Sequence, residues 1–242
     1  MAVTSRYRNA WEGFWREAPP EPGAVFWDAG PELTAAVHLP LFEPHLTDPG
    51  LPLVDLGCGN GTQTRFLADR FAGPVLGVDL SAAAVAHARA QGGPGPAAFR
   101  ELDAVDTAAV AALHAELGDA NVYMRGVLHQ TDPDDRAPLA ATIATLVGRR
   151  GRAFVVEPGE AAGRELGALA QGPDGPPPPL LPVLRHGIAP AAVADAAVPE
   201  YFGAAGLDVL ASGDAPLATT AYTTNGSRIE LPSLWLVTGR RA

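Results

Sequence analysis

Three glycines at alternate positions, Gly57, Gly59 and Gly61, lie between a short apolar run and a helical pattern. Glycine allows a sharp turn and lets a ligand lie directly against the main chain. A helix that begins at this point leaves its first N–H groups free to face whatever is bound. Asp55 precedes the glycines, and an acid at the head of such a loop would repel a phosphate. The loop is therefore predicted to bind a cationic ligand against bare backbone.

Two more carboxylates follow at the ends of the next two apolar runs. Asp79 lies at the end of the run 75–80, and Asp103 ends the run 99–103. In an open parallel sheet, ligands bind outside the carboxyl ends of the strands. A carboxylate after the second strand can accept both hydroxyls of a ribose, and one after the third can accept the exocyclic amine of an adenine. A glycine loop followed by these two acids predicts an adenosine-containing cofactor.

The glycine spacing distinguishes two kinds of adenosine cofactor. A dinucleotide fingerprint is G-x-G-x-x-G, whereas here an acid precedes three alternate glycines. S-adenosylmethionine carries a sulfonium and an ammonium and no phosphate, which suits a loop headed by an acid. Residues 54–61, 77–81 and 103–104 together resemble the class I S-adenosylmethionine-dependent methyltransferases. The resemblance extends over about residues 51–157.

This resemblance implies an α/β fold: a Rossmann-like, seven-stranded, mainly parallel sheet with helices on both faces, an antiparallel last strand and an N-terminal helical cap. It also implies that S-adenosylmethionine is the cofactor. The residues predicted to bind it are Asp55, Gly57, Cys58, Gly59, Gly61, Thr62, Asp79, Leu80, Asp103, Ala104, Arg125 and Trp27. We expect Cys58 to be a small side chain beneath the cofactor rather than a nucleophile. Arg125 is expected to have a structural role or to pair with Asp55 or an acidic substrate.

The fourth apolar run leads into His129, the candidate catalytic residue. The resemblance places the end of this strand next to the transferable methyl group, where an imidazole can act as general base, worth ~10²–10⁴-fold. The stretch is similar to the Leu-His-Asp-Trp segment of one O-methyltransferase group, in which the histidine is the base. However, Gln130 replaces the acid, and the dimerisation domain of that group has no counterpart here. The alternative is a histidine that only packs or lines the pocket.

The elements that must position these residues are apolar strands that alternate with helices, which implies parallel βαβ units. Strands are predicted over residues 53–56, 75–79, 97–102, 121–126, 152–156, 207–211 and 233–238. Helices are predicted over 62–71, 82–91, 107–117, 133–147, 159–170 and 199–205, with Ser81 and Thr107 as caps. The proline-rich segment 172–182 is predicted to be a stiff polyproline loop, either an inert connection or one wall of a substrate pocket. Tyr201, Tyr222 and His186 are candidates for lining the acceptor pocket.

Residues 1–49 are predicted to form a cap or lid, and residues 50–242 the S-adenosylmethionine-binding domain. Three of the four tryptophans, Trp11, Trp15 and Trp27, lie in the first segment, and its aromatic residues recur at helical spacing. This segment either packs on the rim of the sheet domain or closes over the cofactor and excludes water. Trp27 is the candidate aromatic that touches the cofactor or the substrate.

Composition and net charge limit the kinds of partner that this protein can have. The net charge of −10 argues against nucleic acid or an anionic membrane as the main partner. The single cysteine excludes an internal disulfide and fits a reducing cytosol, and there is no long apolar run or signal-peptide core, so a cytoplasmic location is expected. His, Asp and Glu show no metal-ligand spacing, so no metal is expected. We expect a monomer or homodimer acting on a small-molecule or peptide substrate.

The favoured function is an S-adenosylmethionine-dependent methyltransferase, with a natural product or small metabolite as the acceptor and the acceptor atom left open. The alternative on the same fold is a cyclase or decarboxylase that holds the cofactor without consuming it, in which case product forms without S-adenosylhomocysteine. A third alternative is a degenerate, ligand-sensing partner subunit. The intact Gly57, Gly59, Gly61, Asp79 and Asp103 argue against this last alternative.

Overall fold

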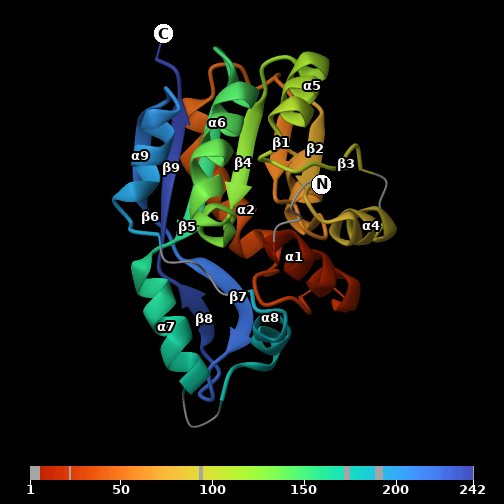
Figure 1. The fold of residues 1–242 in the computed structure, drawn as a ribbon, viewed down its shortest axis with the longest axis vertical. Coiled ribbons are helices and arrows are strands. Elements are labelled where there is room, and N and C mark those ends of the chain that lie inside the picture. The colour runs from red at the N-terminus through yellow and green to blue at the C-terminus, as the bar shows by residue number, and fades with distance from the viewer. Residues whose placement is uncertain (1–5, 22, 93–94, 172–174, 189–192, 242) are drawn as a thin grey trace.

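The computed structural model describes residues 6–21, 23–92, 95–171, 175–188 and 193–241. Its main feature is a seven-stranded sheet in the order β3-β2-β1-β4-β5-β9-β6 (Figure 1). The strands are β1 (Leu53–Leu56), β2 (Val75–Asp79), β3 (Ala98–Glu101), β4 (Asn121–Arg125), β5 (Ala153–Pro158), β6 (Asp208–Asp214) and β9 (Ser233–Gly239). Strands β1 to β5 pair in parallel, and β9 is antiparallel to both of its neighbours. The predicted fold class is confirmed.

Helices cover both faces of this sheet. One face carries α2 (Ala35–Phe42), α3 (Thr62–Ala68) and α4 (Ala82–Ala90), and the other carries α5 (Thr107–Leu117), α6 (Arg136–Val147) and α9 (Ala197–Ala204). Successive strand side chains point to opposite faces. Thus Leu53 belongs to the first core and Val54 to the second. No helix within the described ranges has the length and apolar character needed to cross a membrane.

Side-chain hydrogen bonds determine where α4 and α5 begin. The Ser81 hydroxyl accepts the N–H of Ala84 at 3.1 Å and caps α4, as predicted. The predicted cap of α5, Thr107, is wrong by one residue. Asp106 is the cap instead, because its carboxylate accepts the N–H groups of Ala108 and Ala109 at 3.0 Å each.

A second layer lies beyond the carboxyl ends of the parallel strands, at the bottom of Figure 1. It consists of α7 (Glu160–Gln171), the turn η5 (Pro178–Leu180), α8 (Leu181–Arg185) and the hairpin of β7 (Leu217–Tyr222) and β8 (Arg228–Leu231). The helix at α7 is confirmed, but the hairpin was not predicted. The polyproline prediction is wrong over 178–182, because a proline fits the first turn of a helix. Residues 172–174 of that prediction lie outside the described residues.

The helix α1 (Arg6–Glu17) packs against α4 and the end of β2. The Glu12 carboxylate accepts the Ser81 hydroxyl at 2.7 Å and the Ala83 N–H at 3.2 Å. The Arg8 guanidinium donates to the Leu80 carbonyl at 3.3 Å. Two short turns, η1 (Pro31–Leu33) and η2 (Glu43–His45), flank α2 as the chain approaches β1. The N-terminal segment thus lies over the strand ends, while the domain boundary at residue 49 stays a prediction.

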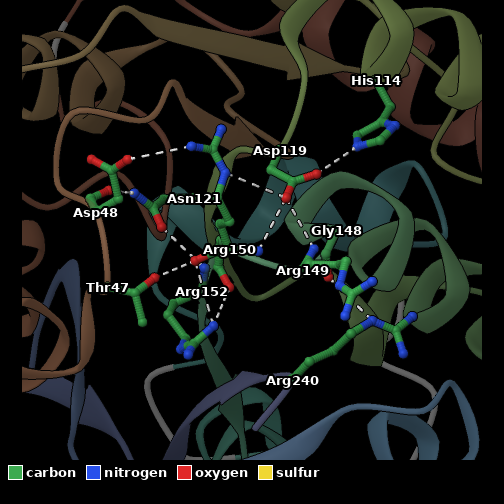
Figure 2. A network of polar contacts seen from close by, with 11 residues as sticks. Thr47, Asp48, His114, Asp119, Asn121, Gly148, Arg149, Arg150, Arg152 and Arg240 are labelled. Carbon is green, nitrogen blue, oxygen red and sulfur yellow. Dashed lines mark hydrogen bonds and ion pairs between the residues drawn. The ribbon is translucent and has the colours of Figure 1, made fainter. Parts of the chain in front are cut away.

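A polar network holds the amino ends of β4 and β5 (Figure 2). The Asp119 carboxylate accepts the N–H groups of Arg149 and Arg150 at 3.0 Å each. The side-chain oxygen Oδ1 of Asn121 accepts the N–H of Arg152 at 3.0 Å. These bonds set the turn between α6 and β5 and thereby the position of β5 beside β4. The opposite ends of these two strands carry residues of the site described next.

Candidate active site

A cavity of about 730 Å³ lies between the carboxyl ends of the strands, α1 and the second layer. The predicted site residues that line it are Trp27, Asp55, Gly57, Cys58, Gly59, Thr62, Asp79, Leu80, Arg125 and His129. Gly61, Asp103 and Ala104 do not line it, and neither do Tyr201, Tyr222 or His186, which had been candidates for the acceptor pocket. The fold therefore brings most of the predicted residues to one place, whereas their individual roles stay predictions.

The loop between β1 and α3 is glycine-rich for a steric reason. Gly57 and Gly59 have φ of +77° and +53°, which L side chains rarely adopt. A Cβ on Gly57 would lie 2.5 Å from the Val127 side chain, and one on Gly59 would lie 2.8 Å from the Trp15 ring. Neighbouring side chains thus occupy the space in which a Cβ would stand, and the loop presents bare backbone to the cavity.

Two buried carboxylates stand beside this loop. Asp79 accepts the N–H groups of Gly59 and Ser81 at 2.9 Å each, and Asp55 accepts the Thr64 hydroxyl at 2.6 Å. Burial raises the pKa of both Asp55 and Asp79 to about 6. Within the part of the chain that the structure describes, no salt bridge reaches either carboxylate. Because a buried carboxylate without an ion-pair partner is unfavourable, this end of the cavity favours a cation.

The segment before α2 contributes a third acid. Asp28 is buried, lines the cavity and accepts an N–H from the Asn60 side chain at 2.7 Å. Its neighbour Trp27 accepts, through its carbonyl, a hydrogen bond of 3.0 Å from the Arg125 guanidinium. Arg125 therefore holds the N-terminal segment rather than pairing with Asp55. We had not predicted Asp28, because only folding brings residue 28 to the glycine loop and the sole local signal was the adjacent tryptophan.

Three predicted cofactor residues stand apart from the cavity. The Asp103 carboxylate forms an ion pair of 2.5 Å with Arg8 of α1. Gly61 caps α3 with φ of +79°, and a Cβ there would lie 2.6 Å from the Phe99 ring, so its place in the loop is set by close packing. Ala104 packs against the second core. An adenine contact by Asp103 stays a prediction, and in this structure that carboxylate already has a cationic partner.

Glu157, at the carboxyl end of β5, shapes the turn that follows β4. Its buried carboxylate accepts the N–H groups of Val127 and Leu128 at 2.9 Å each and that of His129 at 3.2 Å. The short helical turn η3 (Leu128–Gln130) therefore wraps around this side chain. Glu157 was not among the predicted site residues, although, like Asp79, it is an acid at the carboxyl end of a parallel strand.

The same carboxylate orients the imidazole of His129. His129 Nδ1 lies 2.8 Å from Glu157 Oε2, and His129 Nε2 lies 2.9 Å from the side-chain nitrogen of Gln130. A carboxylate accepts and an amide nitrogen donates, so Nδ1 carries the proton and Nε2 offers its lone pair. His129 and Gln130 both line the cavity. In this arrangement the side-chain amide of Gln130 covers Nε2 of the imidazole.

The thiol of Cys58 is buried and free. Burial raises the pKa of this thiol well above its usual value, and the charges of Asp79 and Asp55 raise it further. A thiol that stays protonated is a poor nucleophile, which agrees with the packing role expected for it. Among the described residues, no group of three or more His, Cys, Asp or Glu side chains is placed to hold a metal ion.

Comparison with known proteins identifies the family of this chain. The sequence model of the methyltransferase domain family matches residues 53–151. A crystal structure of an S-adenosylmethionine-dependent methyltransferase from Anabaena variabilis ATCC 29413 is 32% identical, covers 97% of this chain and 95% of that chain, and has a TM-score of 0.89. The chain therefore belongs to the class I S-adenosylmethionine-dependent methyltransferase superfamily, and its cofactor is S-adenosylmethionine. A search among curated proteins finds no match.

More distant solved structures share the fold. Magnesium protoporphyrin IX methyltransferase from Synechocystis PCC 6803, with bound S-adenosylhomocysteine, is 19% identical, covers 87% of this chain and 82% of that chain, and has a TM-score of 0.56. A geranyl diphosphate methyltransferase in complex with its substrate and sinefungin is 15% identical, covers 98% of this chain and 100% of that chain, and has a TM-score of 0.62.

The lining residues fit S-adenosylmethionine. The bare backbone at Gly57 and Gly59 leaves room for a ligand against the main chain, and the buried Asp55 and Asp79 favour a cation over a phosphate. These residues would hold the cofactor at one end of the cavity. The remainder of the cavity, which His129 also lines, would be left for a second molecule.

Proposed function

We propose that this protein transfers the methyl group of S-adenosylmethionine to a small-molecule acceptor with a protic nucleophile. The observation that carries the proposal is that one cavity joins the glycine loop and the buried acids to the His129–Glu157 pair. A cationic methyl donor and a general base would then face each other across a space enclosed by α1. The names of the two distant neighbours give a porphyrin and an isoprenoid diphosphate as acceptors. Both are small molecules, as proposed here.

The proposed reaction requires one proton acceptor. When bound, S-adenosylmethionine supplies an electrophilic methyl group: the acceptor atom would take the methyl group, S-adenosylhomocysteine would leave, and His129 Nε2 would accept the proton that the acceptor loses. The Glu157 carboxylate holds the imidazole and stabilises the imidazolium that forms. The Gln130 amide must turn away from Nε2 before an acceptor can reach it.

The surroundings support such chemistry in a dry site. Trp11 and Trp15 of α1 line the cavity, and Glu12 and Arg8 tie this helix to the end of β2 and the start of α4. Exclusion of water strengthens electrostatic interactions inside and removes the hydration shell of the nucleophile. We further propose a natural product as the acceptor, a cytoplasmic location, and a monomer or homodimer. The free, buried Cys58 is compatible with a reducing compartment.

The proposal is tested by cofactor binding and by product analysis. Calorimetry should show binding of S-adenosylmethionine, and Asp79→Asn should weaken it by about 10–100-fold, because a hydrogen bond to a charged group is worth ~1.5–3 kcal/mol. Asp69→Asn, a change at an exposed carboxylate, is the matched control. Isotope-labelled S-adenosylmethionine and an acceptor panel should yield labelled product and S-adenosylhomocysteine in equal amounts.

Three outcomes would contradict this function. The wild-type protein could fail to bind S-adenosylmethionine, or Asp79→Asn could leave the affinity unchanged, which would show that the cofactor lies elsewhere. Product formed without S-adenosylhomocysteine would indicate a cyclase or decarboxylase on the same fold.

A further inference from the structure

The part of the cavity away from the acids is an apolar chamber formed by the second layer. Its side chains come from α7, η5, α8 and the β7–β8 hairpin, and they include Leu166, Leu180, Val183, Leu184, Leu217 and Leu231. The charged side chains that line the cavity from this layer are Glu160 and Arg164 of α7, and both are exposed. A ligand in the chamber would therefore be surrounded by hydrocarbon, and a charge on it would have no buried partner among the described residues.

The helix α7 leaves this chamber open. Gly163 and Gly167 both line the cavity, and their spacing of four residues places them on the same face of the helix. A Cβ built on either glycine meets no atom within 4 Å. Glycine destabilises a helix interior relative to alanine, and here no close contact requires it. Gly163 is exposed and Gly167 is partly buried, so no side chain of the helix at these two positions stands between the cavity and solvent.

The chamber also has an apolar rim. Leu181 and Leu184 of α8 are 45% and 46% exposed, and Leu184 lines the cavity as well. An exposed leucine such as Leu184 at the edge of a cavity suits an apolar ligand. The exposed leucine at the edge, the glycine face of α7 and the apolar lining all favour an apolar ligand.

We propose that this apolar chamber is the acceptor subsite, and that the acceptor is an uncharged, predominantly hydrocarbon molecule whose single protic group faces His129. This inference rests on the function proposed above and adds the substrate class. Pockets of about 300–1,000 Å³ hold drug-sized ligands, so a cavity of about 730 Å³ accommodates a cofactor together with an acceptor of limited length.

The test is a homologous series of 4-alkylphenols, from methyl to octyl, titrated by calorimetry into protein saturated with S-adenosylhomocysteine. Each added methylene should tighten binding by about fourfold until the chamber is full, because this is the effect of burying one methylene. A second series that carries a carboxylate at the end of the alkyl chain should bind at least tenfold more weakly at every length.

Variants then locate the binding site. Gly163→Leu and Gly167→Leu should shorten the chain length at which affinity stops rising and should leave S-adenosylmethionine affinity within twofold. Gly203→Leu is the matched control, because Gly203 is an exposed glycine of α9 with open space around it and lies outside the cavity. Leu166→Ala enlarges the chamber and should increase the alkyl chain length at which affinity stops rising.

The outcomes separate this inference from the function on which it rests. If the cofactor binds but the phenol series shows no dependence on chain length, or the leucine variants leave it unchanged, the acceptor subsite is not here and the methyltransferase proposal stands. If the cofactor does not bind, the proposed function fails, and the same phenol titration without cofactor still decides whether the chamber takes hydrocarbon.

Discussion

The imidazole of His129 is oriented by a residue 28 positions later in the chain. Glu157 is 1% exposed and accepts N–H groups from three consecutive residues as well as Nδ1–H of His129. An acceptor-only side chain at Nδ1 selects the tautomer in which Nε2 is basic. Glu157 is thus a positioning residue, and the basicity available at Nε2 depends on it.

We predict that Glu157→Gln lowers the catalytic rate by roughly 10²-fold, because a misoriented base loses most of the ~10²–10⁴-fold that general-base catalysis supplies. Affinity for S-adenosylmethionine should stay within threefold, and the acidic limb of the rate–pH profile should shift. Rates over pH 5–9 check this, with Glu165→Gln, at an exposed carboxylate on α7, as the control. An unchanged profile and rate would show that His129 only packs.

At the scale of elements, α1 ties the N-terminal segment to the end of β2 and the start of α4. The Glu12 carboxylate accepts the Ser81 hydroxyl and the Ala83 N–H at the start of α4, and Arg8 pairs with Asp103. Partial burial raises the pKa of Glu12, but hydrogen bonds from Ser81 and Ala83 and the charge of Arg16 together lower it below its usual value. The helix is therefore held by these polar contacts in addition to its buried Phe14 and Trp15.

Glu12→Ala should loosen this helix. Because two hydrogen bonds to an ionised acceptor are lost, we expect amide exchange in α1 to rise by about tenfold or more, and cofactor affinity to fall severalfold. Hydrogen-exchange mass spectrometry measures the first effect and calorimetry the second. Arg16→Ala removes only the exposed pair with Glu12 and should change neither quantity measurably. Equal amide exchange of α1 in the two variants would show that the Glu12 hydrogen bonds do not hold this helix.

At the scale of the whole molecule, buried acids link folding, cofactor binding and pH. Burial raises the pKa of Asp55 and Asp79 to about 6, above the usual value near 3.9. Between about pH 4 and 6 the folded protein therefore holds more protons than the unfolded chain, so these two groups stabilise the free protein at low pH, and this contribution is lost as the pH rises through 6. A bound cation has the opposite preference, because it stabilises the ionised carboxylates.

We therefore predict that S-adenosylmethionine binding releases protons near pH 6 and strengthens as the pH rises from 5 to 7. Calorimetry at pH 6 in two buffers of different ionisation enthalpy measures the release, which should vanish at pH 8. Asp55→Asn should reduce the release at pH 6, whereas Asp69→Asn should not. Proton uptake at pH 6 would show that the cofactor is not held beside these acids.

Much of the site could be predicted because its chemistry is local in the chain. The glycines of the loop need positive φ, and Asp79 directly follows an apolar run; both requirements are met by residue type and position alone. Glu157 has the same local signal as Asp79, because it too is an acid at the carboxyl end of a parallel strand. By contrast, nothing near Asp28 in the chain indicates that folding places it beside Asn60.

The amino-acid sequence by itself determined the alternation of strands and helices, the bare glycine loop and the acids at the strand ends, because short-range sterics and periodicity specify these. The tertiary structure alone decided which distant groups meet: Arg8 with Asp103, Glu157 with His129, and α7 with the apolar chamber. Such pairings depend on how elements pack in three dimensions, and the chain order of two residues carries no information about that distance.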